Sequence, residues 1–366
     1  MEGYLQMRLV ISAVNFTEGG PLTVLRDAVE AATTHFPDWE IIVAVNRVGL
    51  IPPSRAREIA FPEPKSSWLR RLQLEWFGFR RLSRELKPDV WLSLHDITPR
   101  VEATRQYVYC HNPAPFCTVT VPLEQLDRSF RLFRRFYGLL YRCFIHRNAA
   151  VIVQQQWLRD QFKMRFGVRQ VIVAHPTSAV DNFSQPHASA LPSTFFYPAF
   201  PRVFKNIELL GECAARLENN PAWNGKILIT LDGRENAYAR TMRERYGHLR
   251  SLVFLGLQNK LQMEALYSEC DAIIFPSLLE TWGLPISEAK ARKIPVLAAD
   301  LPYARETVGN YDAIRFFDPQ DADSLAQLLL NLHLGAESLG TARSSAPDAP
   351  FAEDWKSLLK MILSDC

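Results

Sequence analysis

The chain has 366 residues, with a hydrophobic share of 48%, a charged share of 22% and a formal net charge of +3. This length exceeds what one hydrophobic core usually supports, and the composition is typical of a globular protein, so two domains of ordinary size are expected. No apolar run approaches the ~20 residues that a membrane-spanning helix needs, and the start of the chain lacks the basic and apolar regions of a secretory signal. The sequence therefore predicts a cytoplasmic protein.

The first half of the chain alternates short apolar runs with amphipathic segments. Residues 8–14 predict a strand, and a helical pattern follows after Gly19 and Gly20. A glycine pair between a strand and a helix lets the backbone approach a ligand closely, although a plain turn is the alternative. Further strands are expected at residues 40–45, 88–96 and 106–111, before a strand–helix–strand unit at residues 149–175.

Two of these predicted strands end at a histidine. His95 closes one, and His111, followed by Asn112, closes the next. Because the carboxyl ends of parallel strands meet at one edge of a sheet, both side chains are expected near one rim. Either histidine can instead be a satisfied structural residue, and Asn112 before Pro113 also suits a turn.

The second half repeats the alternation after a polar stretch. Residues 179–194 hold two prolines with several serine and asparagine residues, and predict a linker. Strand and helix patterns then alternate over residues 195–345, and residues 346–366 contain a final amphipathic helix expected to return to the first domain. We therefore predict an α/β protein of two doubly wound domains, at residues 1–178 and 195–345.

A pair of glutamates marks the most informative stretch. Residues 272–275 are apolar and rich in β-branched residues, which predicts a buried strand with Glu280 on the loop that follows it. Gly283 permits a tight turn and Pro285 suits the start of a helix, so Glu288 is expected in the first turn of that helix. A helix start offers unpaired N–H groups to a phosphate. Two carboxylates beside it predict a site for a ligand with both phosphate and hydroxyl groups, such as a nucleotide-sugar.

A basic motif lies upstream, with Arg202, Lys205 and Asn206 just before an expected helix. A lysine at a loop-to-helix junction can meet a diphosphate that the helix dipole neutralises only in part. The alternative is that Asn206 caps the helix and leaves both cations as ordinary surface residues.

These motifs together resemble a known family. The Glu280-x7-Glu288 pair, its Phe-Pro-Ser and Gly-Leu-Pro surroundings and the upstream basic motif resemble the donor site of GT4-like, retaining glycosyltransferases with the GT-B fold. The family usually spaces its arginine and lysine more widely, after a Gly-Arg that is missing here. The resemblance implies two Rossmann-like domains facing each other across a cleft, with an N-terminal acceptor-binding domain and a C-terminal nucleotide-sugar donor-binding domain.

The resemblance also implies roles for the candidate residues. Glu280 is expected to hold donor-sugar hydroxyls and Glu288 the nucleotide ribose, and His111 to lie beside the donor sugar and the acceptor. The sugar and its departing diphosphate are expected to contact the remaining candidates: Gly19, Gly20, Asn112, Arg202, Lys205, Gly283 and Leu284.

The implied activity is retaining sugar transfer to a glycan or lipid-linked glycan in cell-surface polysaccharide synthesis, with a nucleotide-sugar as co-substrate and no metal or other cofactor. Asp321 and Asp323 spell an Asp-x-Asp, a metal-binding signature of a different fold, but they precede an apolar run and most simply cap a helix. A noncatalytic nucleotide-sugar-binding protein of the same fold is the alternative function.

Positive charge is concentrated in the first half of the chain. Residues 65–87, from Lys65 to Lys87, hold seven cations and two acids, and residues 127–147 hold six arginines, ending at Arg147, against Asp127 alone. Aromatic and leucine residues are interleaved with both sets, which is typical of a helix that binds an anionic membrane surface. The alternative is an amphipathic helix whose aromatics face the core. No nucleic-acid recognition motif is present, so we expect peripheral association with the inner face of the plasma membrane.

Overall fold

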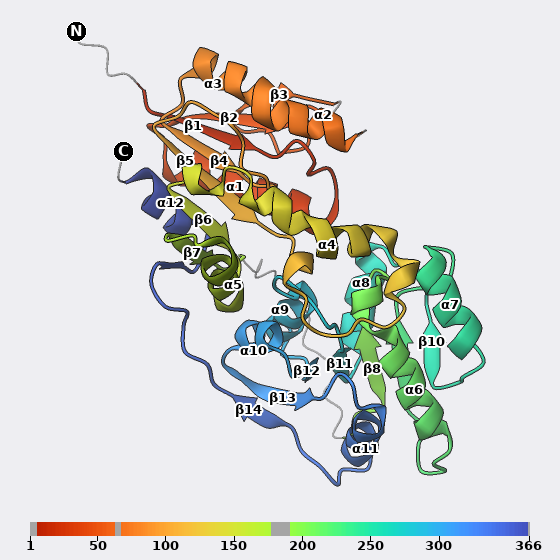
Figure 1. Cartoon of the computed structure of the whole chain (residues 1–366). Coiled ribbons are helices and arrows are strands. Elements are labelled where there is room, and N and C mark those ends of the chain that lie inside the picture. Colours follow the sequence, from red (N-terminus) through yellow and green to blue (C-terminus); the bar gives the residue numbers. More distant parts are fainter. Residues whose placement is uncertain (1–5, 63–66, 177–190, 365–366) are drawn as a thin grey trace. The chain divides into compact units, whose positions relative to one another are not determined.

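The computed structural model describes residues 6–62, 67–176 and 191–364 and contains two compact units, each built on its own sheet (Figure 1). The N-terminal unit combines residues 1–115, 136–177 and 347–366. The C-terminal unit combines residues 116–135 and 178–346. The expectation of two doubly wound α/β domains is confirmed.

The division between the units falls inside helix α4 (Arg128–Arg142). The first half of this helix groups with the C-terminal unit, whereas the sequence placed all of residues 1–178 in one domain. The basic, aromatic composition of this segment gave no boundary signal. Most of the predicted linker, together with Lys65, lies outside the described residues.

The N-terminal sheet has eight strands in the order β15-β7-β6-β5-β4-β1-β2-β3, and all neighbouring pairs are parallel. Its strands are β1 (Arg8–Ser12), β2 (Glu40–Val45), β3 (Arg57–Ala60), β4 (Val90–Ser93), β5 (Arg105–Cys110), β6 (Ala150–Val153), β7 (Val171–Ala174) and β15 (Phe351–Ala352). The chain moves outward from β1 to β3 and then continues on the other side of β1 with β4. The direction of winding therefore reverses between β1 and β4, and ligands of such sheets bind at the carboxyl ends of the strands at this switch point.

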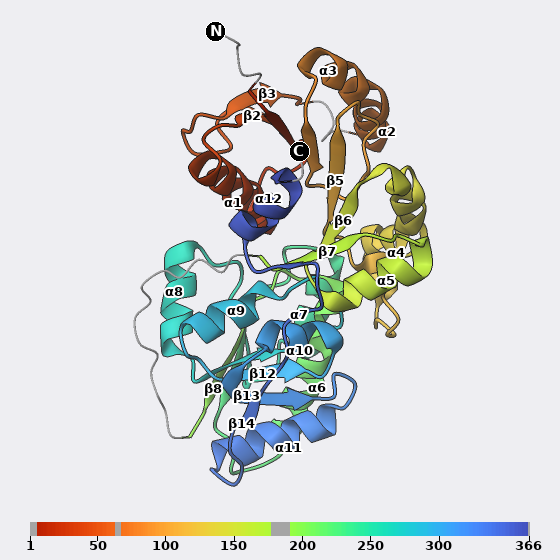
Figure 2. The same ribbon diagram turned by 90° about the vertical axis from the view of Figure 1, so that its left-hand side faces the viewer.

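Both faces of this sheet are buried by helices, as is usual for parallel sheets. Leu9 and Ile11 of β1 face a core that includes α1 (Gly19–His35) and α12 (Trp355–Leu363), which lie side by side (Figure 2). On the opposite face, Trp91 packs against Phe79. The remaining helices of the unit are α2 (Trp68–Gln73), the π-helical turn η2 (Leu74–Gly78), α3 (Phe79–Leu86) and α5 (Gln156–Phe166).

The C-terminal sheet has seven strands in the order β10-β9-β8-β11-β12-β13-β14, and only the β13–β14 pair is antiparallel. Its strands are β8 (Thr194–Tyr197), β9 (Lys226–Ile229), β10 (Leu252–Phe254), β11 (Ala272–Phe275), β12 (Val296–Ala299), β13 (Tyr311–Phe317) and β14 (Gly340–Ala342). Winding reverses between β8 and β11, which places the switch point at the ends of these two strands. The helices are α6 (Ile207–Glu218), α7 (Ala237–Tyr246), α8 (Lys260–Glu269), α9 (Leu284–Ala291), α10 (Pro302–Val308) and α11 (Ala322–His333).

The last segment of the chain is anchored in the N-terminal unit by a buried arginine. Arg159 of α5 is 1% exposed, and its Nη1 donates to the carbonyl of Asp348 at 2.6 Å. Its Nη2 donates to the carbonyl of Pro350, directly before β15. These bonds satisfy carbonyl groups of a segment that has only two residues of strand pairing, so the arginine sets where the segment docks.

We predict that Arg159→Met weakens this docking. Loss of charge-assisted hydrogen bonds to two carbonyls is expected to lower the free energy of unfolding of the N-terminal unit by about 2–3 kcal/mol. Urea unfolding measures the loss, and limited trypsin digestion should cut the C-terminal segment faster. Arg169→Met, at an exposed position just before β7, is the control and should leave both measurements unchanged.

Candidate active site

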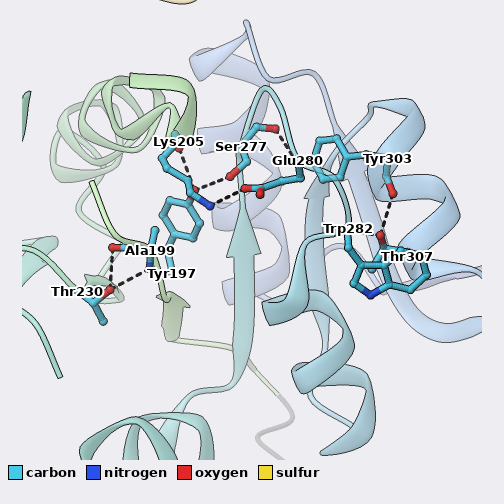
Figure 3. Close-up of polar contacts among 9 residues, drawn as sticks. All are labelled: Tyr197, Ala199, Lys205, Thr230, Ser277, Glu280, Trp282, Tyr303 and Thr307. Carbon is cyan, nitrogen blue, oxygen red and sulfur yellow. Dashed lines mark hydrogen bonds and ion pairs between the residues drawn. The ribbon is translucent and has the colours of Figure 1, made fainter. Parts of the chain in front are cut away.

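Four of the predicted site residues lie on the two loops that leave the switch point of the C-terminal sheet. The loop after β8 carries Arg202 and Lys205, and the loop after β11 carries Glu280 and Gly283. Lys205 and Glu280 point toward each other (Figure 3). Because β8 and β11 are parallel neighbours, both loops emerge at the same edge of the sheet. Residues about 75 positions apart in the chain are thereby brought into contact.

Lys205 and Glu280 form an ion pair at this edge. The Lys205 Nζ lies 2.5 Å from Glu280 Oε1, and the two side chains are 15% and 16% exposed. The ammonium group also lies 5.6 Å from the ring centroids of both Phe204 and Phe275. The pair is therefore only weakly screened by water, and each charge orients the other.

Buried hydroxyl groups fix the two loops around this ion pair. Tyr197, at the end of β8, donates from its Oη to the carbonyl of Lys205 at 3.0 Å and lies 2.7 Å from Ser277 Oγ. Tyr303 of α10 donates to the carbonyl of Ser277 at 2.6 Å. Burial raises the pKa of both tyrosines well above the usual range for tyrosine, and the charge of Glu280 raises it further. Both hydroxyl groups therefore remain protonated donors.

Asn206 also links the loop after β8 to the loop after β11. Its backbone has a left-handed conformation with φ 56°, and its side-chain amide donates to the carbonyls of Pro276 at 3.3 Å and Pro319 at 2.9 Å. The side chain makes no capping hydrogen bond to α6, so the capping alternative is wrong. Thr230, at the end of β9, closes the loop after β8 by accepting from and donating to the backbone of Ala199 (Figure 3).

Gly283 is the N-cap of α9 and has φ 89°, a left-handed conformation that glycine adopts without strain. Pro285 lies in the first turn of the helix, as its second residue and not its first. Glu288 does not lie in the first turn: it is the fifth helical residue, so the prediction of a first-turn position is wrong. The helix begins at Leu284, one residue before the predicted first position at Pro285.

Glu288 is held by a residue that sequence reasoning missed. Tyr267 of α8 is 2% exposed and donates from its Oη to Glu288 Oε2 at 2.5 Å. Burial and the neighbouring Glu288 charge raise the pKa of Tyr267 well above its usual range. The tyrosine thus remains a donor and fixes the rotamer of the carboxylate. No local motif signals this contact, because the two residues are 21 positions apart.

Arg202 is engaged differently from Lys205. Its Nε donates to Asp127 Oδ2 at 2.6 Å, and its guanidinium carbon lies 5.7 Å from the ring centroid of Phe204. Phe204 in turn packs against Phe130 of α4, with ring centroids 5.4 Å apart. Asp127 and the start of α4 therefore contact the basic motif that contains Arg202. The sequence did not indicate this contact. The predicted contact of Arg202 with a diphosphate stays a prediction.

The candidates of the N-terminal unit lie at the carboxyl edge of its own sheet. His111 follows β5, with its ring 4.4 Å from that of Tyr109 and 5.4 Å from that of Phe16. Burial lowers the pKa of His111, against an opposing effect of Asp96. The Asn112 side chain accepts from the backbone N–H of Ala114 at 3.0 Å, as the turn alternative predicts.

The glycine pair lies where α1 begins. Gly19 is the first residue of α1, with φ 63°, and Gly20 is exposed beside it. Both follow β1, whose carboxyl end lies at the switch point of the N-terminal sheet. Whether they contact a ligand stays a prediction.

His95 does not reach the surface. It is 1% exposed, its Nδ1 lies 2.9 Å from Oε1 of the buried Glu75, and its carbonyl accepts from Arg71 at 2.6 Å. This arrangement gives His95 a structural environment beneath the loop that follows β1, where its ring meets Phe16 edge-on at 6.2 Å. The sequence placed both histidines at one rim, but only His111 is partly exposed.

The Asp-x-Asp sequence has the helix-capping role expected for it. Asp321 is the N-cap of α11 and its side chain accepts from the backbone N–H of Ser324 at 2.9 Å. The carboxylate of Asp323 pairs with Arg216. Both carboxylates are therefore used within the protein.

Comparisons with known proteins agree with this geometry. Residues 181–340 match the family described as "Glycosyl transferases group 1". The "O-antigen chain mannosyltransferase RfbU" of Salmonella typhimurium is 28% identical over 120 residues, which are 32% of this chain and 33% of the relative. The "Serotype-specific mannosyltransferase WbdA" of Escherichia coli is 28% identical over 155 residues, 42% of this chain and 18% of the relative. The aligned part thus spans a third or less of these curated relatives.

Solved structures extend the likeness to the whole chain. The "lipopolysaccharide outer core galactosyltransferase WaaB apo form" superposes with a TM-score of 0.66 at 14% identity and covers 98% of this chain and 100% of that chain. Anabaena HepE in complex with UDP and glucose has a TM-score of 0.57 at 14% identity and covers 97% of this chain and 95% of that chain. At such identities the likeness shows the fold, which is GT-B with two Rossmann-like domains. Residues 181–340 therefore match the domain of the group 1 glycosyltransferases.

We predict that Gly283→Ala destabilises the C-terminal unit. A left-handed conformation costs a residue with a Cβ about 1–2 kcal/mol. The new Cβ would also lie 3.3 Å from Phe275 Cε1. Chemical denaturation should show a loss of this size.

Gly138→Ala is a control with the opposite expected sign. Gly138 lies inside α4, and an added Cβ would meet Phe166 at an ordinary 3.9 Å. Replacing a helical glycine by alanine should therefore stabilise the protein by about 0.5–1 kcal/mol. Equal effects of the two substitutions would contradict the role assigned to the Gly283 conformation.

Proposed function

We propose that this protein is a retaining, metal-independent glycosyltransferase that moves a sugar from a nucleotide-sugar to a glycan or lipid-linked glycan acceptor in cell-surface polysaccharide synthesis. The observation that carries the proposal is the Lys205–Glu280 ion pair at the switch point, on loops adjoining the amino end of α9. The names of the relatives, an O-antigen chain mannosyltransferase and a lipopolysaccharide galactosyltransferase, support a surface-glycan acceptor.

Charge development during the reaction explains why this site needs a cation and helix amides. Cleavage of the anomeric bond leaves additional negative charge on the nucleoside diphosphate, while the sugar becomes oxocarbenium-like. Preorganised positive groups at the phosphate therefore accelerate departure. We assign this role to Lys205 and to the backbone N–H groups of Gly283 and Leu284 at the start of α9, with Arg202 joining them after leaving Asp127.

The two carboxylates hold the neutral parts of the donor. Glu280 Oε1 keeps Lys205 in place, and we assign Oε2 to the hydroxyl groups of the donor sugar. Glu288, whose rotamer Tyr267 fixes, is assigned to the ribose hydroxyls of the nucleotide. Carboxylates accept such hydrogen bonds more strongly than neutral oxygens do, which favours a sugar ligand over an apolar one.

His111 is assigned to the acceptor side. Because burial lowers its pKa, the imidazole is neutral at neutral pH and is able to accept a proton. The departing phosphate itself is the second group that can deprotonate the acceptor hydroxyl. With Lys205 meeting the diphosphate charge, and with Asp321 and Asp323 used as a helix cap and an ion-pair partner, we propose that the reaction needs no divalent metal.

We predict that Glu280→Gln, which keeps the size of the side chain but removes its charge, lowers the turnover number roughly 100-fold or more. Glu280→Ala should abolish turnover. The measurement is release of nucleoside diphosphate, using the donor that gives the largest thermal shift in a panel of UDP-, GDP- and dTDP-sugars. The acceptor probe is a detergent-solubilised polyprenyl-diphosphate glycan.

Asp323→Asn is the matched control, because it removes an exposed carboxylate of the same unit. It should retain turnover, and EDTA should not inhibit the unmodified protein. Normal turnover by Glu280→Ala would refute the role assigned to this residue. A thermal shift with a nucleotide-sugar but no release of nucleoside diphosphate under any condition would favour the noncatalytic binding protein.

We further propose that the acceptor is met at the inner face of the plasma membrane. Helix α4 exposes Leu132, Phe136 and Leu139, which are 56%, 49% and 60% exposed and recur at helical spacing. Exposed arginines flank this stripe at positions 128, 131, 135 and 142. The opposite face buries Phe130, Tyr137 and Tyr141, so that the core-facing alternative accounts for one side of α4 only.

A second exposed apolar surface adjoins α4. Trp68 of α2 meets Tyr137 edge-on at 6.0 Å, and Trp76 of η2 meets Phe144 at 5.7 Å. Leu69 and Phe77 from the same two segments are 79% and 63% exposed. Cations beside apolar side chains fit an anionic lipid surface. Among the described residues, no helix combines the length and the apolar character required to cross a bilayer, so the docking proposed is peripheral.

We predict that Arg131→Glu with Arg135→Glu reduces the affinity for vesicles containing anionic phosphatidylglycerol, measured by co-sedimentation, about thirtyfold or more, since each of the two lost cations contributes about 1 kcal/mol near such a surface. Both arginines are exposed on the outer face of α4. Arg71 and Arg134 are poorer choices, because Arg71 is buried and Arg134 is paired with Glu124 at 2.5 Å. Raising the salt concentration should weaken binding of the unmodified protein.

The control is Arg240→Glu with Arg250→Glu, an equal change of net charge at exposed positions of the C-terminal unit. Sedimentation should be normal in this control and absent with purely zwitterionic vesicles. Unchanged sedimentation of the α4 variant would contradict the docking proposal without affecting the proposal of sugar transfer.

A further inference from the structure

Asp96 receives four donors at the carboxyl edge of the N-terminal sheet. Its Oδ1 accepts from the backbone N–H groups of His111 at 2.5 Å and Asn112 at 3.1 Å. The hydroxyl of Tyr141 donates to the same oxygen at 3.0 Å, and that of Tyr137 donates to Oδ2 at 3.1 Å. One carboxylate therefore joins the loop after β4, the loop after β5 and the inner face of α4.

The backbone of Asp96 supports this arrangement. Its φ is 67°, a left-handed conformation that aspartate and asparagine adopt more readily than most other residues with a Cβ. Its N–H donates to the carbonyl of Tyr109 at 3.1 Å, which pins the turn to β5. The carboxylate is thus aimed at the residues that directly follow that strand.

The donors that reach Asp96 remain protonated at neutral pH. Burial, followed by the charge of Asp96, raises the pKa of Tyr137 and Tyr141 well above its usual range. Tyr141 also donates to the carbonyl of Asn112 at 2.9 Å, so that it holds the loop after β5 at a second atom. Hydrogen bonds to a carboxylate are roughly twice as strong as neutral ones, which suits a group that must hold a loop in one geometry.

We propose that Asp96 is the positioning residue for His111 and Asn112, which it holds in place for the acceptor while tying them to α4. The inference rests on the proposed function for the role of His111. Asp96 does not touch the substrate in this proposal: it acts through the two backbone N–H groups and through its charge beside the imidazole. Tyr137 and Tyr141 are its partners on α4.

Several groups surround the His111 ring and set its protonation. Burial has the largest effect and lowers the pKa of His111. Asp96 and then the Leu94 carbonyl raise this pKa, and His95, with the smallest effect, lowers it. Phe16 and Tyr109, whose rings pack against the imidazole, carry no charge at neutral pH. Removal of the Asp96 charge is therefore expected to lower the pKa of His111 further.

The test is Asp96→Asn, which keeps an oxygen acceptor, the side-chain size and a residue that tolerates the left-handed backbone. In the transfer reaction with the polyprenyl-diphosphate glycan probe, the turnover number should fall about tenfold, as expected when charge-assisted hydrogen bonds become neutral. The affinity for the nucleotide-sugar should change less than the turnover number, because Lys205, Glu280 and Glu288 belong to the other unit. The acid limb of the pH profile should move to lower pH.

Asp89→Asn is the matched control. Asp89 stands at the opposite end of the same strand, where its Oδ2 accepts from the backbone N–H of Arg8 at 2.7 Å. This variant should lose the charge-assisted hydrogen bond from Arg8 but keep the turnover number and the pH profile. Tyr141→Phe and Tyr137→Phe should each reduce turnover in the same direction as Asp96→Asn, by a smaller factor.

A second measurement separates this inference from the proposed function. Hydrogen–deuterium exchange of the peptide covering residues 105–116 should be faster in Asp96→Asn than in Asp89→Asn, whether or not any transfer is detected. Absence of transfer by the unmodified protein, together with faster exchange, would refute the proposed function and leave the positioning role standing. Wild-type turnover, pH profile and exchange in Asp96→Asn would overturn the inference.

Discussion

The site depends on one topological constraint, the reversal of winding between adjacent parallel strands. In the C-terminal sheet this reversal separates the loops after β8 and β11, so that their side chains meet at one edge with no helix crossing between them. Lys205 and Glu280 occupy these two loops and close them into an ion pair. The N-terminal sheet reverses between β1 and β4, and there Asp96, on the loop after β4, binds the loop after the neighbouring strand β5.

The two edges solve the problem of a buried charge in different ways. At the C-terminal edge a carboxylate is matched by an ammonium group, and the surrounding tyrosines hold the backbone rather than the charges. At the N-terminal edge the Asp96 carboxylate is matched by N–H and O–H donors alone. An ion pair can exchange one partner for a charged ligand, whereas the neutral N–H and O–H donors around Asp96 are parts of the fold itself. The Lys205–Glu280 ion pair therefore suits binding of a diphosphate, whereas the hydrogen bonds to Asp96 suit a loop that is held in one geometry.

Sequence patterns predicted the fold and the donor-side pair because those features are local. The strand at residues 272–275 is uniformly apolar, and glycine and proline mark the turn and the helix start beside it. Strand β13 was not predicted, since Asp312 and Arg315 interrupt its apolar pattern, and β3 is a partly exposed edge strand. The contacts of Asp96, Tyr267 and Asp127 were also missed, because each links residues 15 or more positions apart. Burial of His95 depends on Glu75, whose pairing has no sequence signature.

Helix α4 and the residue before it make contacts with both of the loops described above, those of Arg202 and Asp96. Asp127, just before its start, pairs with Arg202 in the C-terminal unit, while Tyr137 and Tyr141 reach Asp96 in the N-terminal unit. Its outer stripe of Leu132, Phe136 and Leu139 is exposed. An exposed apolar stripe between arginines is the feature of α4 on which the proposed membrane docking rests. The inner face fixes the loops, and the outer face retains the composition that favours a lipid surface.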